Sequence, residues 1–199
     1  MQRRDFIKTT AIITPMMSLF PSDLSALTRE SLPGKIEKRS LGRTGEMLSV
    51  IGFGGIVVKD ATPGESSGLV KLAIDSGINY FDVAPSYGDA EIKLGPALEP
   101  YRKGVILNCK TTKRSRDEAR AELEQSLKNL RTDHFDVYQF HAVTTIADVD
   151  AILGKGGAME TFLAARKEGK IRFIGFSAHS VEAAMAMMDR FDFDTILFL

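Results

Sequence analysis

Short apolar runs alternate along this chain with longer segments in which apolar residues recur every three or four positions. The runs are typical of strands and the periodic segments are typical of amphipathic helices. Strands are predicted at 50–54, 80–83, 105–110, 135–141, 171–177 and 195–199, after a small hairpin of 35–40 and 46–49. Helices are predicted between them, at 65–76, 90–102, 115–131, 159–168 and 181–190.

Two of these helices carry more detailed expectations. In the helix at 65–76, the apolar residues Leu69, Leu72 and Ala73 recur at helical spacing. The clearest helical pattern lies at 115–131 and begins with a predicted capping box, in which Ser115 and Glu118 bond to each other's backbone N–H groups. Its apolar face is formed by Ala119, Leu123, Leu127 and Leu130.

Strands separated by helices indicate a parallel sheet, because each crossover helix returns the chain to the same end of the sheet. Two architectures share this pattern, the doubly wound sheet and the α/β barrel. The dinucleotide-binding doubly wound sheet carries the motif GxGxxG after its first strand. Here Gly52 and Gly54 match the first two glycines of that motif, but Val57 stands at the third. The sequence therefore predicts a barrel.

Composition narrows the function classes. The 199 residues are 44% hydrophobic and 26% charged, as in one globular domain with a sizeable core. Lys plus Arg and Asp plus Glu each number 26, so the formal net charge is zero and nucleic acid is not an expected partner. The single cysteine, Cys109, excludes an internal disulfide and a cysteine-ligated cluster. The three histidines lack the spacing of metal ligands, so no metal site is predicted.

The first 30 residues are set apart from the predicted fold. Arg3 and Arg4 precede a hydrophobic pair, a lysine and an apolar stretch at 9–20, which resembles a twin-arginine export signal. The stretch is shorter than the roughly 20 residues of a membrane-spanning helix, and no lipid-anchor cysteine follows it. We expect residues 1–30 to engage the twin-arginine export machinery and residues 35–199 to form a periplasmic domain. The alternative is a cytoplasmic protein whose arginine pair has no targeting role.

Four side chains capable of proton chemistry follow successive predicted strands: Asp82, Tyr87, Lys110 and His141. In a parallel barrel, the loops at the C-terminal ends of the strands converge on one mouth. A carboxylate, a phenol, an amine and an imidazole gathered there can deliver a proton to a substrate. Each residue alone has an ordinary structural explanation, and it is their shared placement that indicates function.

Three segments, in this order, resemble the motifs of the aldo/keto reductase family: FDVAPSYGDAEIKLGPAL, SLKNLRTDHFDVYQFH and GKIRFIGFSAHS. The resemblance covers 35–199 and implies a (β/α)8 TIM barrel that binds NADPH, or NADH, without a Rossmann fold. It implies an oxidoreductase that reduces a small aldehyde or ketone to an alcohol. The family's catalytic positions fall on Asp82, Tyr87, Lys110 and His141, and its cofactor contacts on Gly54, Gly55 and Ser177.

The residue types suggest a role for each member of this quartet. Tyrosine is a weak acid, but a nearby ammonium group such as that of Lys110 stabilises the phenolate left behind. Asp82 would keep Lys110 charged and oriented. His141 can donate a hydrogen bond to the substrate oxygen and stabilise developing negative charge. Tyr87 is then the general acid.

Departures from the family pattern leave other readings open. The family often holds the nicotinamide amide with an asparagine and a glutamine, and here Ala178 and Leu197 stand at those positions. The chain ends within the sixth predicted strand, so we expect an incomplete barrel of about six strands, a fragment of a longer protein, with two open edges. Two alternatives to the reductase are a Schiff-base aldolase that uses Lys110 and an inert or nucleotide-sensing relative.

Overall fold

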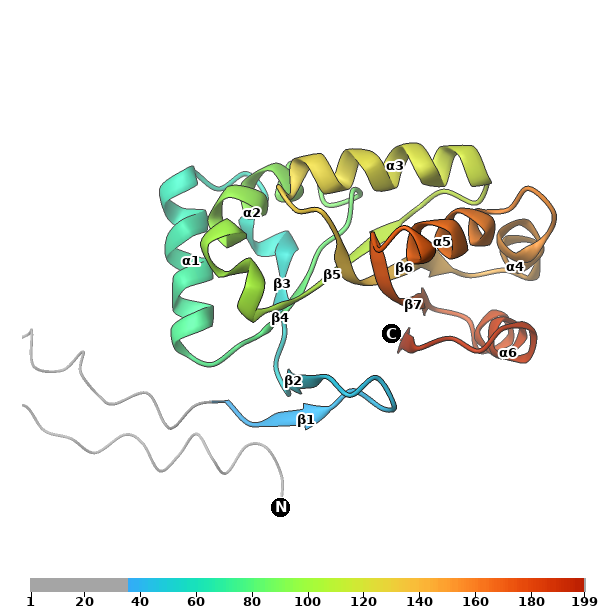
Figure 1. Ribbon diagram of the computed structural model, residues 1–199, viewed down its shortest axis with the longest axis horizontal. Helices are drawn as coiled ribbons and strands as arrows, with labels where there is room; N and C mark the ends of the chain where they lie inside the picture. Colours follow the sequence, from blue (N-terminus) through green and yellow to red (C-terminus); the bar gives the residue numbers. More distant parts are fainter. Residues whose placement is uncertain (1–35, 199) are drawn as a thin grey trace, which may run out of the picture. The chain divides into compact units, whose positions relative to one another are not determined.

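The computed structural model describes residues 36–198 of the chain. The predicted export signal at 1–30 lies outside the described residues. Six parallel strands form the central sheet, side by side in chain order: β3 (Phe53–Gly54), β4 (Tyr80–Asp82), β5 (Ile106–Thr111), β6 (Phe135–Val143), β7 (Ile171–Ala178) and β8 (Thr195–Phe198). A doubly wound sheet reverses its strand order at a switch point. This sheet never reverses, so the predicted barrel architecture is confirmed as a partial barrel (Figure 1).

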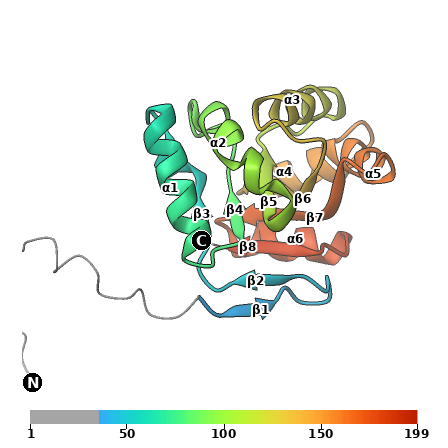
Figure 2. The same ribbon diagram turned by 60° about the vertical axis from the view of Figure 1, so that its left-hand side comes forward.

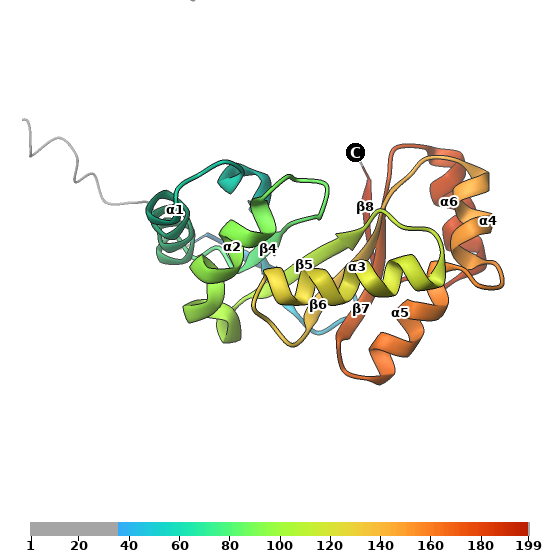
Figure 3. The same cartoon turned by 90° about the horizontal axis from the view of Figure 1, so that it is seen from above.

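Helices connect the strands and cover the outer face of the sheet (Figures 1 and 3). They are α1 (Pro63–Asp75), α2 (Ala90–Leu98), α3 (Arg116–Asn129), α4 (Ile146–Leu153), α5 (Ala158–Lys167) and α6 (Val181–Arg190), with short 3-10 segments η2 (Gly55–Val58) and η3 (Glu99–Gly104). The predicted apolar face of α3 is buried as expected. Within residues 36–198, no helix combines the length and the apolar character needed to cross a membrane.

Aromatic packing shows which side chains of β6 face the helices. The ring of Phe140 stacks on Phe162 of α5 with centroids 3.9 Å apart, and Tyr138 lies 4.9 Å from the same ring. Successive side chains of a strand point to opposite faces. Gln139 and His141 therefore point to the other face, the interior of the partial barrel.

A hairpin of β1 (Lys38–Ser40) and β2 (Met47–Ser49) is attached to the N-terminal end of the sheet (Figure 2). Asn79, just before β4, accepts a 2.7 Å hydrogen bond from the Ser49 N–H and donates one of 2.8 Å to the Met47 carbonyl. Arg172 at the start of β7 forms an ion pair with Glu46. The hairpin thus closes the end of the sheet opposite to the C-terminal ends of its strands.

The strand predicted at 50–54 is mostly absent. Only Phe53–Gly54 pairs with β4, while Val50 and Ile51 are 49% and 56% exposed. The Val50 N–H donates to the Glu37 carbonyl at 2.9 Å, and the Ser49 hydroxyl donates to the Ile51 carbonyl at 2.7 Å. The backbone here extends the hairpin, which is why these apolar residues do not enter the sheet.

Of the three apolar residues whose spacing predicted α1, only Ala73 is buried. Leu69 and Leu72 are exposed, and the buried residues of the helix are Ser66, Val70 and Ala73. In a helix, several different sets of residues spaced three and four positions apart can form one face. The contacts of α1 with α2 and η2 determine which of these sets is buried.

Three further differences concern helix ends. The helix predicted at 90–102 ends at Leu98 and continues as η3, because Pro100 has no N–H to extend the α-helical bonding. Ser115 forms no capping box, since its hydroxyl donates to the Glu118 carboxylate at 2.5 Å. The structure has capping boxes at Thr62 with Glu65 and at Thr145 with Asp148, and the second begins α4, a helix that the pattern did not predict.

Gly95 of α2 provides a test of helix packing. A Cβ atom there would lie 2.3 Å from the Asn129 carbonyl oxygen and 2.9 Å from the Leu130 Cα atom at the end of α3. We expect Gly95→Ala to lower the free energy of unfolding by about 1–3 kcal/mol, measured by urea denaturation. In Gly68→Ala, the matched control in α1, the new methyl meets no atom within 4 Å. This control should gain up to about 1 kcal/mol, and equal midpoints for the two variants would contradict the packing.

Candidate active site

Strand alternation directs three of the predicted residues to the barrel interior. In β5, the Cys109 thiol reaches outward to Glu91 of α2 at 3.4 Å. Its neighbour Lys110 therefore points inward. His141 shares the inward face of β6, and Asp82 ends β4 in register with β5. All three lie at the C-terminal ends of their strands, where the reactive residues of a barrel belong.

The loop after β4 adds Tyr87 to this group. Lys110 Nζ forms an ion pair with Asp82 Oδ1 and lies 5.5 Å from the centroid of the Tyr87 ring. The rings of Tyr87 and His141 meet edge to face, at 84° and with centroids 6.0 Å apart. The structure thus brings all four predicted residues into one cluster.

The Lys110 ammonium group is the most deeply buried charge of the cluster. Its side chain is 0% exposed, whereas that of Asp82 is 19% exposed. A buried ammonium needs a compensating negative charge, because transfer out of water is costly for an ion. Asp82 supplies that charge, so the pair places a fixed positive group beside the Tyr87 ring.

Sequence reasoning did not single out Asn108, which orients Asp82. Asn108 Nδ2 donates to Asp82 Oδ1 at 2.6 Å and also lies 3.0 Å from Gln139 Oε1 and from the Tyr80 hydroxyl. Asn108 is fully buried and shares the inward face of β5 with Lys110. A polar residue two positions before Lys110 in an apolar strand is the signal that would have found it.

His141 is held as a neutral side chain. Its half-buried position lowers the pKa of the imidazole, because burial disfavours the charged form and the positive Lys110 adds to the effect, while Asp82 opposes it. A neutral imidazole has one N–H donor and one acceptor nitrogen. His141 can therefore donate a single hydrogen bond toward the mouth at neutral pH.

The predicted cofactor contacts lie around the same mouth. Ser177 is buried near the end of β7, with its Oγ atom 3.0 Å from His141 Nδ1. Gly54 pairs in register with Asp82, and a Cβ atom there would meet nothing within 4 Å. At Gly55 a Cβ atom would lie 2.9 Å from Val83 Cβ, so this glycine allows η2 to pack closely on the residues after β4. Leu197 of β8 lies beside Ser177.

Cys109 is excluded from the chemistry by its surroundings. The thiol is fully buried in the helix layer, and burial raises its pKa well above the usual value, with the Glu91 carboxylate adding to the effect. A thiol is nucleophilic only as the thiolate. The prediction that Cys109 has no catalytic role agrees with this environment.

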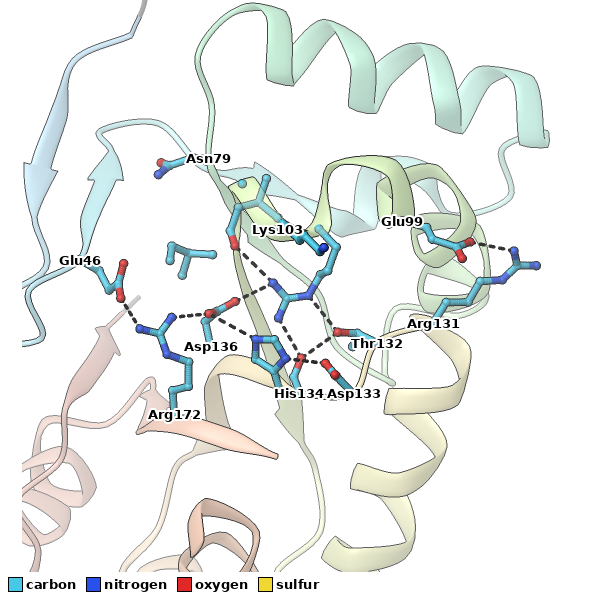
Figure 4. Close-up of a pocket in the computed structure, with 14 residues that line it drawn as sticks. Glu46, Asn79, Glu99, Lys103, Arg131, Thr132, Asp133, His134, Asp136 and Arg172 are labelled. Atoms are coloured by element: carbon cyan, nitrogen blue, oxygen red, sulfur yellow. Dashed lines mark hydrogen bonds and ion pairs between the residues drawn. The ribbon is translucent and has the colours of Figure 1, made fainter. Parts of the chain in front are cut away.

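A cavity of about 810 Å³ lies at the opposite ends of the strands, and most of the charged side chains that line it form ion pairs (Figure 4). Asp136 at the start of β6 accepts from Arg102 at 2.9 Å and from Arg172 at 2.6 Å. Figure 4 shows Arg172 between Glu46 and Asp136, and His134 beside Asp133. Compensated ion pairs that tie the hairpin to the sheet support a structural role for this end.

Comparisons with known proteins agree with this arrangement. A model of the aldo/keto reductase family matches residues 50–197. L-galactose dehydrogenase of Arabidopsis thaliana is 30% identical over 171 residues, which are 78% of this chain and 53% of that protein. Aldo-keto reductase YhdN of Bacillus subtilis is 33% identical over 166 residues, 74% of this chain and 48% of that one. The chain thus spans about half the length of these relatives.

The fold comparison gives the same result. The solved holo form of an aldo-keto reductase from Bacillus halodurans superposes with a TM-score of 0.71 at 26% identity, over 82% of this chain and 57% of that one. The family match covers most of the described residues, including all four clustered side chains. The chain therefore belongs to the aldo/keto reductase family of oxidoreductases.

Proposed function

We propose that this chain carries the proton-donating site of an NAD(P)H-dependent reductase that converts a small aldehyde or ketone into an alcohol. The observation that supports this most is the buried Lys110 ammonium, held by Asp82 next to the Tyr87 ring. A dehydrogenase named for L-galactose and a reductase named for 6-dehydroglucose are among its relatives, and both names describe carbonyl–alcohol chemistry.

Reduction of a carbonyl requires a hydride on carbon and a proton on oxygen. Bound NAD(P)H supplies the hydride. Tyr87 donates its phenolic proton to the substrate oxygen, and the Lys110 ammonium stabilises the phenolate that remains. Asp82 holds that ammonium in place, and Asn108 holds the carboxylate.

His141 binds the substrate oxygen before and during proton transfer. The neutral imidazole donates one hydrogen bond to the oxygen, which gains negative charge as the hydride arrives. Its edge-to-face contact with Tyr87 keeps the two donors side by side. Two donors directed at one oxygen fix the carbonyl for reaction.

The residues at the mouth are compatible with a nicotinamide ring. The Ser177 hydroxyl uses one acceptor lone pair for the Ala142 N–H at 2.8 Å and keeps a second one for an amide donor. The open space at Gly54 lets a flat ring approach the end of β3. Ser177 and Gly54 are therefore the residues that would contact the nicotinamide.

The Schiff-base aldolase reading is less well supported. An amine attacks a carbonyl only as a free, neutral nucleophile, whereas Lys110 Nζ is fully buried and already engaged in an ion pair with Asp82. That reading also assigns no role to Tyr87.

Isotope transfer tests the proposal directly. The protein is mixed with an activated nitrobenzaldehyde and NADPH that carries deuterium on the nicotinamide ring, and the product is analysed by mass spectrometry. We expect one deuterium on the carbinol carbon of the alcohol. A substrate adduct trapped on Lys110 by borohydride, with no deuterated alcohol, would instead support an aldolase.

A further inference from the structure

Strand β6 changes its path where it delivers His141. Its register with β7 shifts between Phe140 and Val143, which marks a β-bulge. Within the bulge Ala142 has φ +51°, in the left-handed region that residues with a side chain rarely adopt. Such a conformation costs about 1–3 kcal/mol and persists only where the surroundings hold it.

Arg114, in the loop after β5, is one of the groups that hold the bulge. Its Nη2 atom donates to the His141 carbonyl at 2.9 Å and to the Ala142 carbonyl at 3.2 Å. Its Nε atom donates to Asp148 at 2.9 Å, at the start of α4. One guanidinium group therefore joins the strand of Lys110, the bulge of His141 and the following helix.

Asp148 is a firm anchor for this guanidinium. Burial raises the pKa of its carboxyl group, but the hydrogen bonds from Arg114, Thr144 and Thr145 outweigh that effect and lower the pKa to about 2. The carboxylate therefore stays ionised at neutral pH and keeps Arg114 in position.

Ser177 holds the other side of the bulge. The Ala142 N–H donates to Ser177 Oγ at 2.8 Å, so this oxygen acts as an acceptor there. Its single proton then remains for His141 Nδ1, 3.0 Å away, and no other acceptor within the described residues is bonded to this hydroxyl. With Nδ1 as the acceptor, the proton of the neutral imidazole is on Nε2.

We propose that Arg114 and Ser177 are positioning residues that lock the bulge and hold His141 as the Nε2–H tautomer, ready to donate to the substrate oxygen. The consequence for catalysis rests on the function proposed above, whereas the tautomer itself does not. Arg114 acts through the backbone and Ser177 through the ring nitrogen, so the two effects are separable.

Nitrogen NMR of labelled histidine tests the tautomer without reference to turnover. In the protein without dinucleotide, we expect a pyrrole-type Nε2 and a pyridine-type Nδ1 for His141, assigned by the loss of these signals in His141→Gln. Ser177→Ala removes the donor to Nδ1 and should give a mixture of the two tautomers. An unchanged Nε2–H tautomer in Ser177→Ala would overturn the proposal.

In Arg114→Lys the positive charge stays near Asp148, but a lysine ammonium group cannot bond to the His141 and Ala142 carbonyls and to the Asp148 carboxylate at the same time. Arg102→Lys is its matched control, because Arg102 binds the Val105 and His134 carbonyls and the Asp136 carboxylate at the far end of the sheet. We expect Arg114→Lys to shift the His141 signals and lower kcat about 10-fold to 100-fold, with little change in dinucleotide affinity. Arg102→Lys should lower stability alone.

Equal shifts of the His141 signals in both arginine variants would show a general loosening of the fold and would overturn the role of Arg114. If the signals respond as expected but no carbonyl is reduced by any variant or by the unmodified protein, the tautomer assignment stands and the proposed function fails. The two ideas are thereby tested separately.

Discussion

Tyr87→Phe should lower the turnover of an activated aldehyde by about 100-fold or more while dinucleotide binding stays within about twofold. The substitution keeps the ring that packs against His141 and lies 5.5 Å from Lys110 Nζ, and it removes only the hydroxyl that we propose as the proton donor. General acids typically contribute factors of 10²–10⁴. Steady-state kinetics measures the turnover, and fluorescence titration with NADPH measures the dinucleotide affinity.

Tyr101→Phe is the control for this experiment. Tyr101 lies in η3, toward the opposite end of the strands, and losing its hydroxyl removes the same atom from a site without the quartet. It should leave turnover unchanged. Wild-type turnover in Tyr87→Phe would remove the phenol from the mechanism and leave Lys110 or His141 to be examined as the acid.

Lys110→Met should abolish measurable turnover and also destabilise the fold. The methionine fills a similar volume, but the partly buried Asp82 carboxylate loses its counter-charge. Removing one partner of a buried ion pair typically costs about 3–5 kcal/mol. Urea denaturation and the aldehyde assay on the same preparation measure the two effects, so loss of turnover can be distinguished from loss of folded protein.

A double variant separates the two effects further. Lys110→Met combined with Asp82→Asn leaves no uncompensated charge, so stability should recover by several kcal/mol while turnover stays absent. The control is Lys71→Met in the exposed pair with Asp75, which should change stability by less than about 1 kcal/mol. Recovery of turnover in the double variant would show that the ammonium is not required for proton transfer.

The sequence predicts the inward-facing residues of this site because their placement depends on local rules. A strand alternates its faces, and a parallel sheet brings strand ends together, so Lys110 and His141 could be placed without knowing any long-range contact. Asn108 follows from the same alternation and was available to the same reasoning.

What the sequence does not predict depends on contacts between distant segments. Val50 is apolar and has strand character, yet its N–H is bonded to Glu37 in the hairpin. Leu69 has helical spacing, yet the packing of α1 selects Val70 for the core. Arg114 reads as one more charged loop residue until the bulge of β6 places two carbonyls beside it.

The ion pairs around Asp136 have a consequence for how the sequence of this protein can evolve. They fasten the hairpin, β6 and β7 at one end of the sheet, and the quartet occupies the other end. Substitutions in the loops at the C-terminal ends of the strands can therefore alter the proposed substrate site while these ion pairs stay intact. Directed evolution that randomises those loops and spares Arg102, Asp136 and Arg172 should retain a larger fraction of folded variants than a library spread evenly over both ends.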